Sequence, residues 1–199
     1  MRDLRRFRWR ALTPSLALLV ATMPVAAEAP LTPVRATIEA VIATISDESL
    51  AAETKRQRAL AIIGERFDFD GMTRRVLATH WHRANATQRS EITALFRTLL
   101  INAYWSKLAT YQGEQVEYVD ERLRGTALAS VRAVIKTVRA EIPLEFKLEL
   151  RDERWFAYDV VIEQVSLVRN YRQRFHEVAL AEGIDGLIAY LQAQVAVGN

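Results

Sequence analysis

The hydrophobic pattern of the chain changes its period at Gly113, and this change constrains the fold more than any other feature. Before Gly113, apolar residues recur at three- and four-residue spacing over roughly eighty residues, which is typical of helices. After it, apolar and polar residues alternate in four short segments, which indicates strands. Because helices precede and follow four consecutive strands, we predict an α+β fold with a twisted antiparallel sheet.

The third predicted strand has the clearest alternation. Its apolar residues share one face: Ile142, Leu144, Phe146, Leu148 and Leu150. Its charged residues share the other: Glu141, Glu145, Lys147, Glu149 and Arg151. This strand therefore has one buried face and one face in water.

The other strands and the helices are placed from the same signals. A tight polar turn at 152–154 joins the third strand to a fourth near 155–162, so these two form a hairpin. The first two strands are expected near 115–123 and 128–139, joined through Gly125. The expected helices cover 34–46, 49–65, 69–80, a long segment from Asn85 to Gly113, 166–181, and Ile184 to Val195.

Asn85 begins the best-defined helix. Its side chain can cap the first turn while Gln88 stands three residues later, which is the pattern of a capping box. The apolar stripe of this helix would face the sheet. A short twisted sheet curls, and helices over its concave side leave a wedge between the two layers. Apolar side chains that line this wedge without filling it would form a lipid pocket, whereas an ordinary core would give the same sequence pattern.

The first 27 residues have the layout of a signal peptide. Five arginines precede an apolar run from Ala11 to Ala26 that ends in small residues. The run is shorter than the ~20 residues that span a bilayer, and two prolines interrupt it, which disfavours a retained anchor. We therefore expect residues 1–27 to be removed on secretion and residues 28–199 to form a single α+β domain.

Removal of this segment also changes the charge of the chain. The full sequence has 27 Lys and Arg and 24 Asp and Glu; without the five arginines and one aspartate of residues 1–27, 22 and 23 remain. The basic pI of 9.4 is thus no argument for nucleic-acid binding. The chain contains no cysteine, which excludes disulfides, thiolate metal sites and cysteine nucleophiles.

The histidines and aspartates that could bind a metal or act in catalysis also have structural explanations. His80 and His82 would point about 200° apart on a helix, so they cannot both bind one ion, and we expect no metal and a surface or helix-end role. Asp68 and Asp70, each beside a phenylalanine, could serve acid–base chemistry but fit a helix cap better.

Two further groups of charged residues have more than one interpretation. Asp159 and Glu163 share a strand face and could pair with Arg169 or Arg172. The basic segment 169–176 could bind a phosphate head group or an acidic partner, or could be a solvated helix face. Phosphate loops, nucleophile elbows and zinc-protease motifs are missing from the sequence, so we expect neither an enzyme nor a cofactor.

Several segments, taken in order, resemble the MlaC or toluene-tolerance family. They are Phe67-Asp68-Phe69-Asp70-Gly71-Met72, Leu77-Ala78-Thr79-His80-Trp81, Gln88-Arg89, Phe96-Arg97-Thr98-Leu99-Leu100, Tyr111-Gln112-Gly113-Glu114, the run 158–172, and Gly183-Ile184-Asp185-Gly186-Leu187. The resemblance covers nearly all of residues 28–199. The sequence departs from the family at Gln164, where a glycine is expected, and in the compact junction 140–143.

The resemblance implies a periplasmic, substrate-binding component of a lipid ABC transport system. Such a carrier shuttles phospholipid between an outer-membrane lipoprotein complex and an inner-membrane transporter complex, with the acyl chains inside and the head group outside. Relatives beside hopanoid synthesis leave a hopanoid-type cargo open, and a non-lipid periplasmic adaptor is a further alternative. We expect a monomer that binds no nucleic acid.

The cavity wall of such a carrier can be assigned from the strand and helix faces. We predict that it consists of Leu100, Tyr104 and Leu108 of the long helix, Leu144, Phe146 and Leu148 of the third strand, and Tyr158, Val160 and Ile162 of the fourth. The strand assignments depend on an uninterrupted alternation between the two faces.

Overall fold

The computed structural model describes residues 28–197, so the predicted signal peptide lies outside the described residues. The helices are α1 (Leu31–Ser46), α2 (Ala52–Arg66), α3 (Phe69–Leu77), the 3₁₀ helix η1 (Ala78–His82), α4 (Ala86–Ala109) and α5 (Leu167–Val197). The strands are β1 (Gln115–Arg124), β2 (Leu128–Lys136), β3 (Glu141–Arg151), β4 (Arg154–Ile162) and β5 (Val165–Ser166). Between residues 28 and 197, no helix is both long and apolar enough to cross a bilayer.

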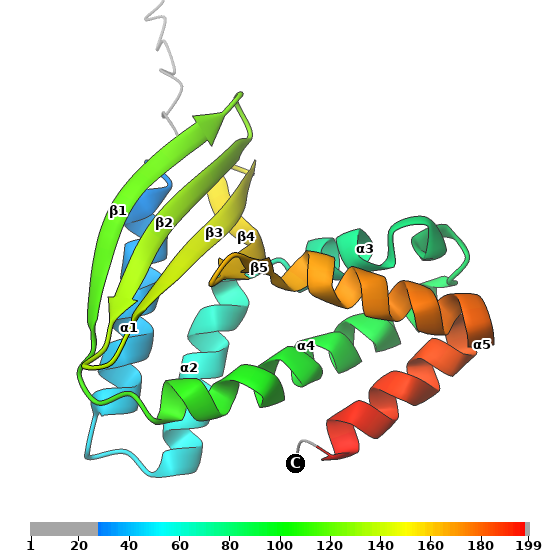
Figure 1. The fold of residues 1–199 in the computed structure, drawn as a ribbon, viewed down its shortest axis with the longest axis horizontal. Helices are drawn as coiled ribbons and strands as arrows, with labels where there is room; N and C mark the ends of the chain where they lie inside the picture. The colour runs from blue at the N-terminus through cyan, green and yellow to red at the C-terminus, as the bar shows by residue number, and fades with distance from the viewer. Residues whose placement is uncertain (1–27, 198–199) are drawn as a thin grey trace, which may run out of the picture.

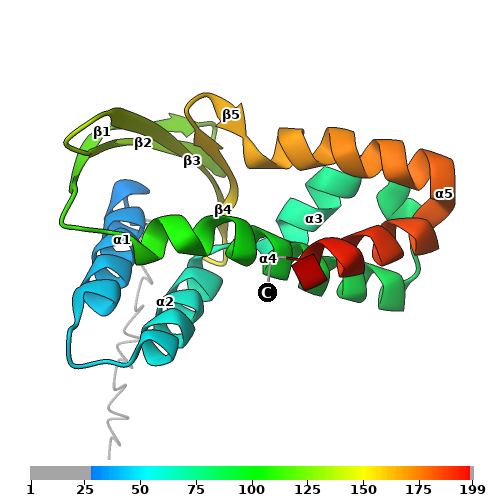
Figure 2. The same cartoon turned by 60° about the horizontal axis from the view of Figure 1, so that its bottom comes forward.

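The sheet is antiparallel, with the strands in the order β1-β2-β3-β4-β5. It curves over α1, and α4 runs from beneath the sheet toward α3 and α5, which form a helical part at the other end of the molecule (Figures 1 and 2). The predicted α+β class and the helix–sheet–helix order are confirmed. The prediction of four strands was wrong, because β5 adds two residues beside β4, too few for alternation to reveal.

Two-residue turns hold the last strands together. Arg151 pairs with Arg154, and the residues between them have positive φ angles of 47° and 61°, so the predicted hairpin of β3 and β4 is confirmed. The turn from β4 to β5 has the same form, and its second residue, Gln164, has a φ of 69°. A glycine suits this left-handed conformation best, which is the physical reason to expect glycine there.

The start of α4 follows the predicted capping box. The Asn85 side chain accepts a hydrogen bond from the Gln88 N–H (2.9 Å), and the Gln88 side chain accepts one from the Asn85 N–H (2.9 Å). The helix ends at Ala109, earlier than predicted, and Gly113 lies in the turn before β1 with a φ of 95°. Gly183, with φ 73° and ψ −169°, interrupts α5 between its two predicted halves.

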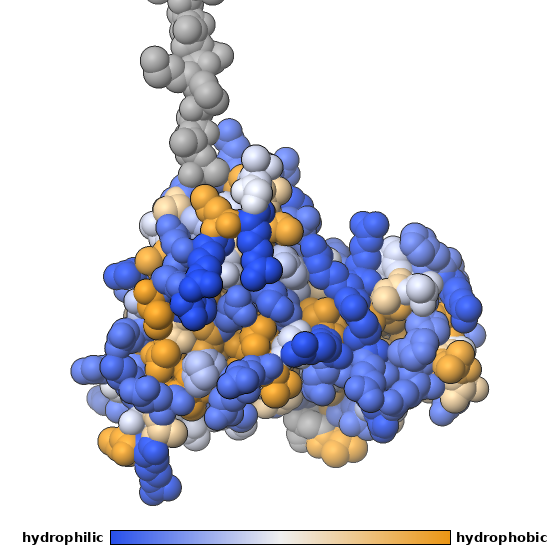
Figure 3. All heavy atoms as spheres, turned by 45° about the horizontal axis from the view of Figure 1, so that its top comes forward, coloured by the Kyte–Doolittle hydropathy of each residue, from blue (hydrophilic) through white to orange (hydrophobic). Residues whose placement is uncertain are grey.

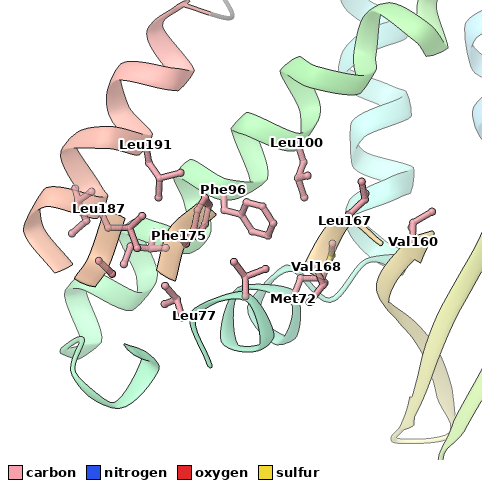
Figure 4. Packing of buried hydrophobic residues seen from close by; sticks show 14 residues of the cluster. Met72, Leu77, Phe96, Leu100, Val160, Leu167, Val168, Phe175, Leu187 and Leu191 are labelled. Atoms are coloured by element: carbon pink, nitrogen blue, oxygen red, sulfur yellow. The ribbon is translucent and has the colours of Figure 1, made fainter. Parts of the chain in front are cut away.

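The core has two parts. The larger part lies between α3, α4 and α5, where the side chains labelled in Figure 4 point toward one another. Phe96 is fully buried there and makes edge-to-face contacts with Tyr171 and Phe175. The smaller part joins Val34 of α1 to β2, β3 and β4. The two parts flank the space between the curved sheet and the helices.

Charged residues pair across the outer face of the sheet, and hydrophilic residues cover most of the face shown in Figure 3. The Arg132 guanidinium on β2 bonds to Asp120 on β1, and this hydrogen bond, with that from Arg122, lowers the pKa of Asp120 to about 2. Since the folded pKa is depressed, this stabilisation is complete above the ordinary pKa and is lost as the pH falls through about 2.

We expect Asp120→Asn to lose less stability than the unchanged protein between about pH 4 and 2 in urea titrations. Identical acid profiles would contradict this.

Ala78 has a backbone conformation that strongly favours glycine. Its φ is 48° and its ψ −116°, at the point where α3 ends and η1 begins, and its side chain is exposed. We expect Ala78→Gly to raise the free energy of unfolding by about 1–2 kcal/mol, because it relieves strain without removing packing. The matched control is Ala103→Gly at an exposed position inside α4, which should lower stability by about 1 kcal/mol in the same urea titration. Equal destabilisation by both changes would contradict the strain at Ala78.

Candidate functional site: an apolar cavity between sheet and helices

A cavity of about 410 Å³ lies between the inner face of the sheet and helices α1, α2 and α4. Its volume is within the range of small-molecule and cofactor sites. Almost all of its lining is apolar; the aliphatic and aromatic wall residues are Val34, Ile38, Val41, Ile42, Ile45, Leu60, Ile63, Phe67, Phe69, Met72, Leu100, Ile101, Tyr104, Trp105, Leu108, Tyr111, Val116, Ile135, Ile142, Leu144, Phe146, Ala157, Val160, Ile162 and Leu167. An apolar chain can therefore leave water here and enter apolar surroundings.

Helix α4 contributes to the cavity with its C-terminal half. Its N-terminal half is packed into the helical core through Ile92 and Phe96. Leu100, Tyr104 and Leu108 follow at four-residue spacing and line the cavity, where the sequence predicted them. Burial raises the pKa of Tyr104 above its ordinary value.

Strands β3 and β4 place four of the predicted residues on the cavity wall. Leu144 pairs with Ile162 and Phe146 pairs with Val160 across the two strands, and all four residues line the cavity. Leu144 and Phe146 retain partial accessibility, which they owe to the open space in front of them. Whether they contact a lipid stays a prediction.

Leu148 and Tyr158 lie outside the lining, contrary to the predicted wall. Leu148 is on the correct face but is fully buried against α1, because helix and sheet close together at that end. The register shifts where Lys147 pairs with Asp159 but Leu148 pairs with Ala157, so Tyr158 is the extra residue of a β-bulge. The bulge reverses the alternation, and the Tyr158 ring instead stacks under the Arg75 guanidinium at 4.1 Å.

Helix α1 supplies a large part of the wall that we did not predict. Val34, Ile38, Val41, Ile42 and Ile45 all line the cavity. Their three- and four-residue spacing marks an apolar helical face in the sequence. The spacing does not say which layer that face packs against, and only the path of the chain under the sheet decides it.

Polar residues of the lining gather at one edge of the cavity. Lys107 and Thr110, at the end of α4, and Glu163, in the turn after β4, are exposed. These three side chains bring polar groups of the lining into contact with water. Arg66 lines the cavity elsewhere, and its guanidinium is occupied: it donates to the Trp155 carbonyl (2.7 Å) and to Thr37 Oγ1 (3.2 Å).

Asp68, which the sequence offered for acid–base chemistry, and the buried Asp159 both have structural partners. Asp68 caps α3 by accepting from the Gly71 N–H (2.9 Å), as predicted, and pairs with Arg151 (2.6 Å). Asp159 is buried and accepts from three donors of the chain: Lys147 Nζ, Ser166 Oγ and the Val168 N–H. The predicted pairing of Asp159 with Arg169 or Arg172 was wrong, because the bulge turns its carboxylate toward Lys147 and the start of α5.

The histidines form a pair that the sequence did not indicate. His80 Nε2 lies 2.9 Å from His176 Nδ1, 96 residues away in the chain. His80 and His82 lie in the last turn of η1, in agreement with the predicted helix-end role; His80 is buried there, whereas His82 is exposed. Burial, with His176 and Arg83 nearby, lowers the pKa of His80. Among residues 28–197, no three histidine, aspartate or glutamate side chains come together as metal ligands.

Comparison with known proteins agrees with this architecture. A family model described as MlaC protein matches residues 35–193. The chain belongs to the MlaC family. This MlaC-family chain also shares its fold with a solved phospholipid-binding protein from Ralstonia solanacearum, determined in complex with a phospholipid. The TM-score is 0.76 at 23% sequence identity, over 86% of this chain and 99% of the other.

Proposed function

We propose that this protein is a periplasmic carrier of phospholipid, with the acyl chains held in the cavity and the head group at its exposed polar edge. The carrier would receive phospholipid from one membrane complex and deliver it to another, between an outer-membrane lipoprotein complex and an inner-membrane ABC transporter complex. The observation that carries the proposal is the cavity itself, which separates the curved sheet from α1, α2 and α4. The MlaC family and the phospholipid-bound structural neighbour support it.

The energetics of such binding follow from the lining. Each methylene that moves from water into an apolar site gains about 0.8 kcal/mol, so the acyl chains alone can hold the ligand. Arg66, the arginine on the described wall, needs no hydrogen-bond acceptor from the ligand, because its guanidinium already donates to Thr37 and Trp155. The exposed edge formed by Lys107, Thr110 and Glu163 leaves room for a head group in water.

Purification without detergent tests the proposal. Native mass spectrometry of the mature protein from the periplasm should show bound lipid, and mass analysis of the extract should identify phospholipid. A hopanoid-type lipid in its place would favour that alternative cargo. Protein that is consistently empty, and that stays empty after incubation with phospholipid vesicles, would contradict the carrier and favour a periplasmic adaptor.

A further inference from the structure

Positive charge is concentrated in two parts of the chain. Residues 71–90 and 164–176 contain seven arginines and all three histidines but no aspartate or glutamate. The rest of residues 28–199 has 15 Lys and Arg against 23 Asp and Glu. The protein without its predicted signal peptide is therefore nearly neutral as a whole but has its two signs of charge segregated.

The fold brings these two stretches together. Arg172 Nε on α5 donates to the Arg75 carbonyl on α3 (2.8 Å), and His80 on η1 is hydrogen-bonded to His176 on α5. Helix α5 lies along α3 in both ribbon views (Figures 1 and 2). The two stretches therefore meet along the first half of α5.

One side of α5 presents this charge to water. Arg169, Arg172, His176 and Leu180 follow one another at three- and four-residue spacing, so they share one helical face, here called the basic stripe. All four are exposed, and the exposed fraction of Leu180 is 68%.

The guanidinium groups of the stripe are not neutralised. Among the described residues, no carboxylate forms an ion pair with Arg169 or Arg172, nor with Arg83 beside His80. Two neighbouring arginines differ, since Arg75 pairs with Glu149 (2.8 Å) and Arg174 with Glu177 (3.8 Å).

We propose that the basic stripe docks the protein onto the surface of an anionic lipid bilayer. Guanidinium groups bind phosphate oxygens through paired hydrogen bonds, and a bilayer surface offers phosphates at high density. Leu180 lies on the same face as the arginines, so it can contact the head-group region when the arginines contact the phosphates. Charge complementarity favours this surface, because a bilayer offers phosphates to all the unpaired arginines of the face at once.

Docking and lipid loading involve different residues. None of the arginines or histidines of the two stretches lines the cavity. The stripe can therefore rest on a membrane while the polar edge of the cavity stays accessible, and charge reversal in the stripe should leave bound lipid unchanged.

Vesicle co-sedimentation tests the proposal. The mature protein should sediment with phosphatidylcholine vesicles that contain about one third phosphatidylglycerol, but not with pure phosphatidylcholine, and about 0.5 M salt should release it. The double variant Arg169→Glu/Arg172→Glu should bind the anionic vesicles at least about thirtyfold more weakly, since loss of the two arginines alone removes about 1 kcal/mol each. The matched control, Arg58→Glu/Arg124→Glu, makes the same charge change at exposed arginines outside the stripe and should bind like the unchanged protein.

A second variant shows whether a loss of binding arises from misfolding. Because Arg172 also bonds to the Arg75 carbonyl, Arg83→Glu/Arg169→Glu, which keeps that bond, should show a similar loss. Native mass spectrometry of both stripe variants should find the same bound lipid as before, which separates a failure of docking from a failure of the carrier. Absence of binding to anionic vesicles, or equal losses in stripe and control variants, would overturn the proposal. So would a periplasmic protein that crosslinks to the stripe when vesicles do not bind.

Discussion

Leu144→Glu should abolish lipid binding and leave a folded protein. Leu144 lies on β3 and faces the cavity, so a glutamate there would place a carboxylate against the acyl chains. In the empty protein the same carboxylate can stay hydrated in the cavity, so the melting temperature should fall only slightly. We expect the lipid-bound fraction in native mass spectrometry to drop at least about tenfold, which corresponds to only ~1.4 kcal/mol of lost binding.

Leu123→Glu is the matched control. It makes the same change on β1 of the same sheet, at a leucine that is 64% exposed and does not line the cavity. Its lipid content should equal that of the unchanged protein. If Leu144→Glu unfolds the chain, Leu144 belongs to an ordinary filled core and the assignment of a lipid cavity is wrong. If it folds and keeps its lipid, the acyl chains lie elsewhere.

Asp159→Ala should be the most destabilising change outside the apolar core. The carboxylate is only 4% exposed and accepts from Lys147 (3.1 Å), Ser166 (2.7 Å) and the Val168 N–H (3.0 Å). It thus ties β3, β4 and the first turn of α5 together. Removal leaves a half-buried ammonium and two buried donors without their acceptor, and we expect a loss of about 3–5 kcal/mol in urea unfolding.

Two comparisons make this result specific. Asp159→Asn keeps an acceptor oxygen but not the charge and should cost less than the alanine variant. Asp152→Asn, at an exposed aspartate in the hairpin turn of the same two strands, should leave stability almost unchanged. A loss below about 1 kcal/mol for Asp159→Ala would mean that water or other acceptors replace the carboxylate.

The structural role of Asp159 also bears on the catalytic interpretation of the sequence. A general base needs an oxygen free to take a proton from a substrate. Both oxygens of Asp159 accept hydrogen bonds within the protein, and Asp68 caps α3 and pairs with Arg151. Loss of function in Asp159→Ala would therefore be expected to follow its loss of stability.

In the proposals above, the basic stripe binds the membrane and the cavity binds the lipid, so the two roles belong to different parts of the protein. The cavity lies on the sheet side, whereas the stripe lies on the first half of α5 in the helical part (Figure 1). A carrier with this layout can approach a bilayer through the stripe and exchange its cargo through the exposed edge at Lys107 and Glu163. The two sets of variants can be combined to separate delivery to the membrane from retention of lipid.

Periodicity was enough to predict the helices and the long strands, because each face of an element must be either buried or wet along its length. It also assigned residues to the correct face of their element wherever the period continued unbroken. On α4 this holds for Leu100, Tyr104 and Leu108, which lie four residues apart on one helical face. On the sheet it holds for Leu144 and Val160, both of which line the cavity.

Only the tertiary structure showed where the alternation of a strand is broken and which layers leave space between them. The bulge at Tyr158 reverses the faces of β4, because one extra residue in a strand shifts the side chains beyond it to the other side. Leu148 is on the predicted face of β3 but does not line the cavity, because α1 packs against the sheet at that point. The apolar face of α1, from Val34 to Ile45, lines the cavity because α1 runs beneath the sheet. A periodic pattern records that a face avoids water; whether that face meets another side chain or an open cavity depends on contacts between residues far apart in the chain.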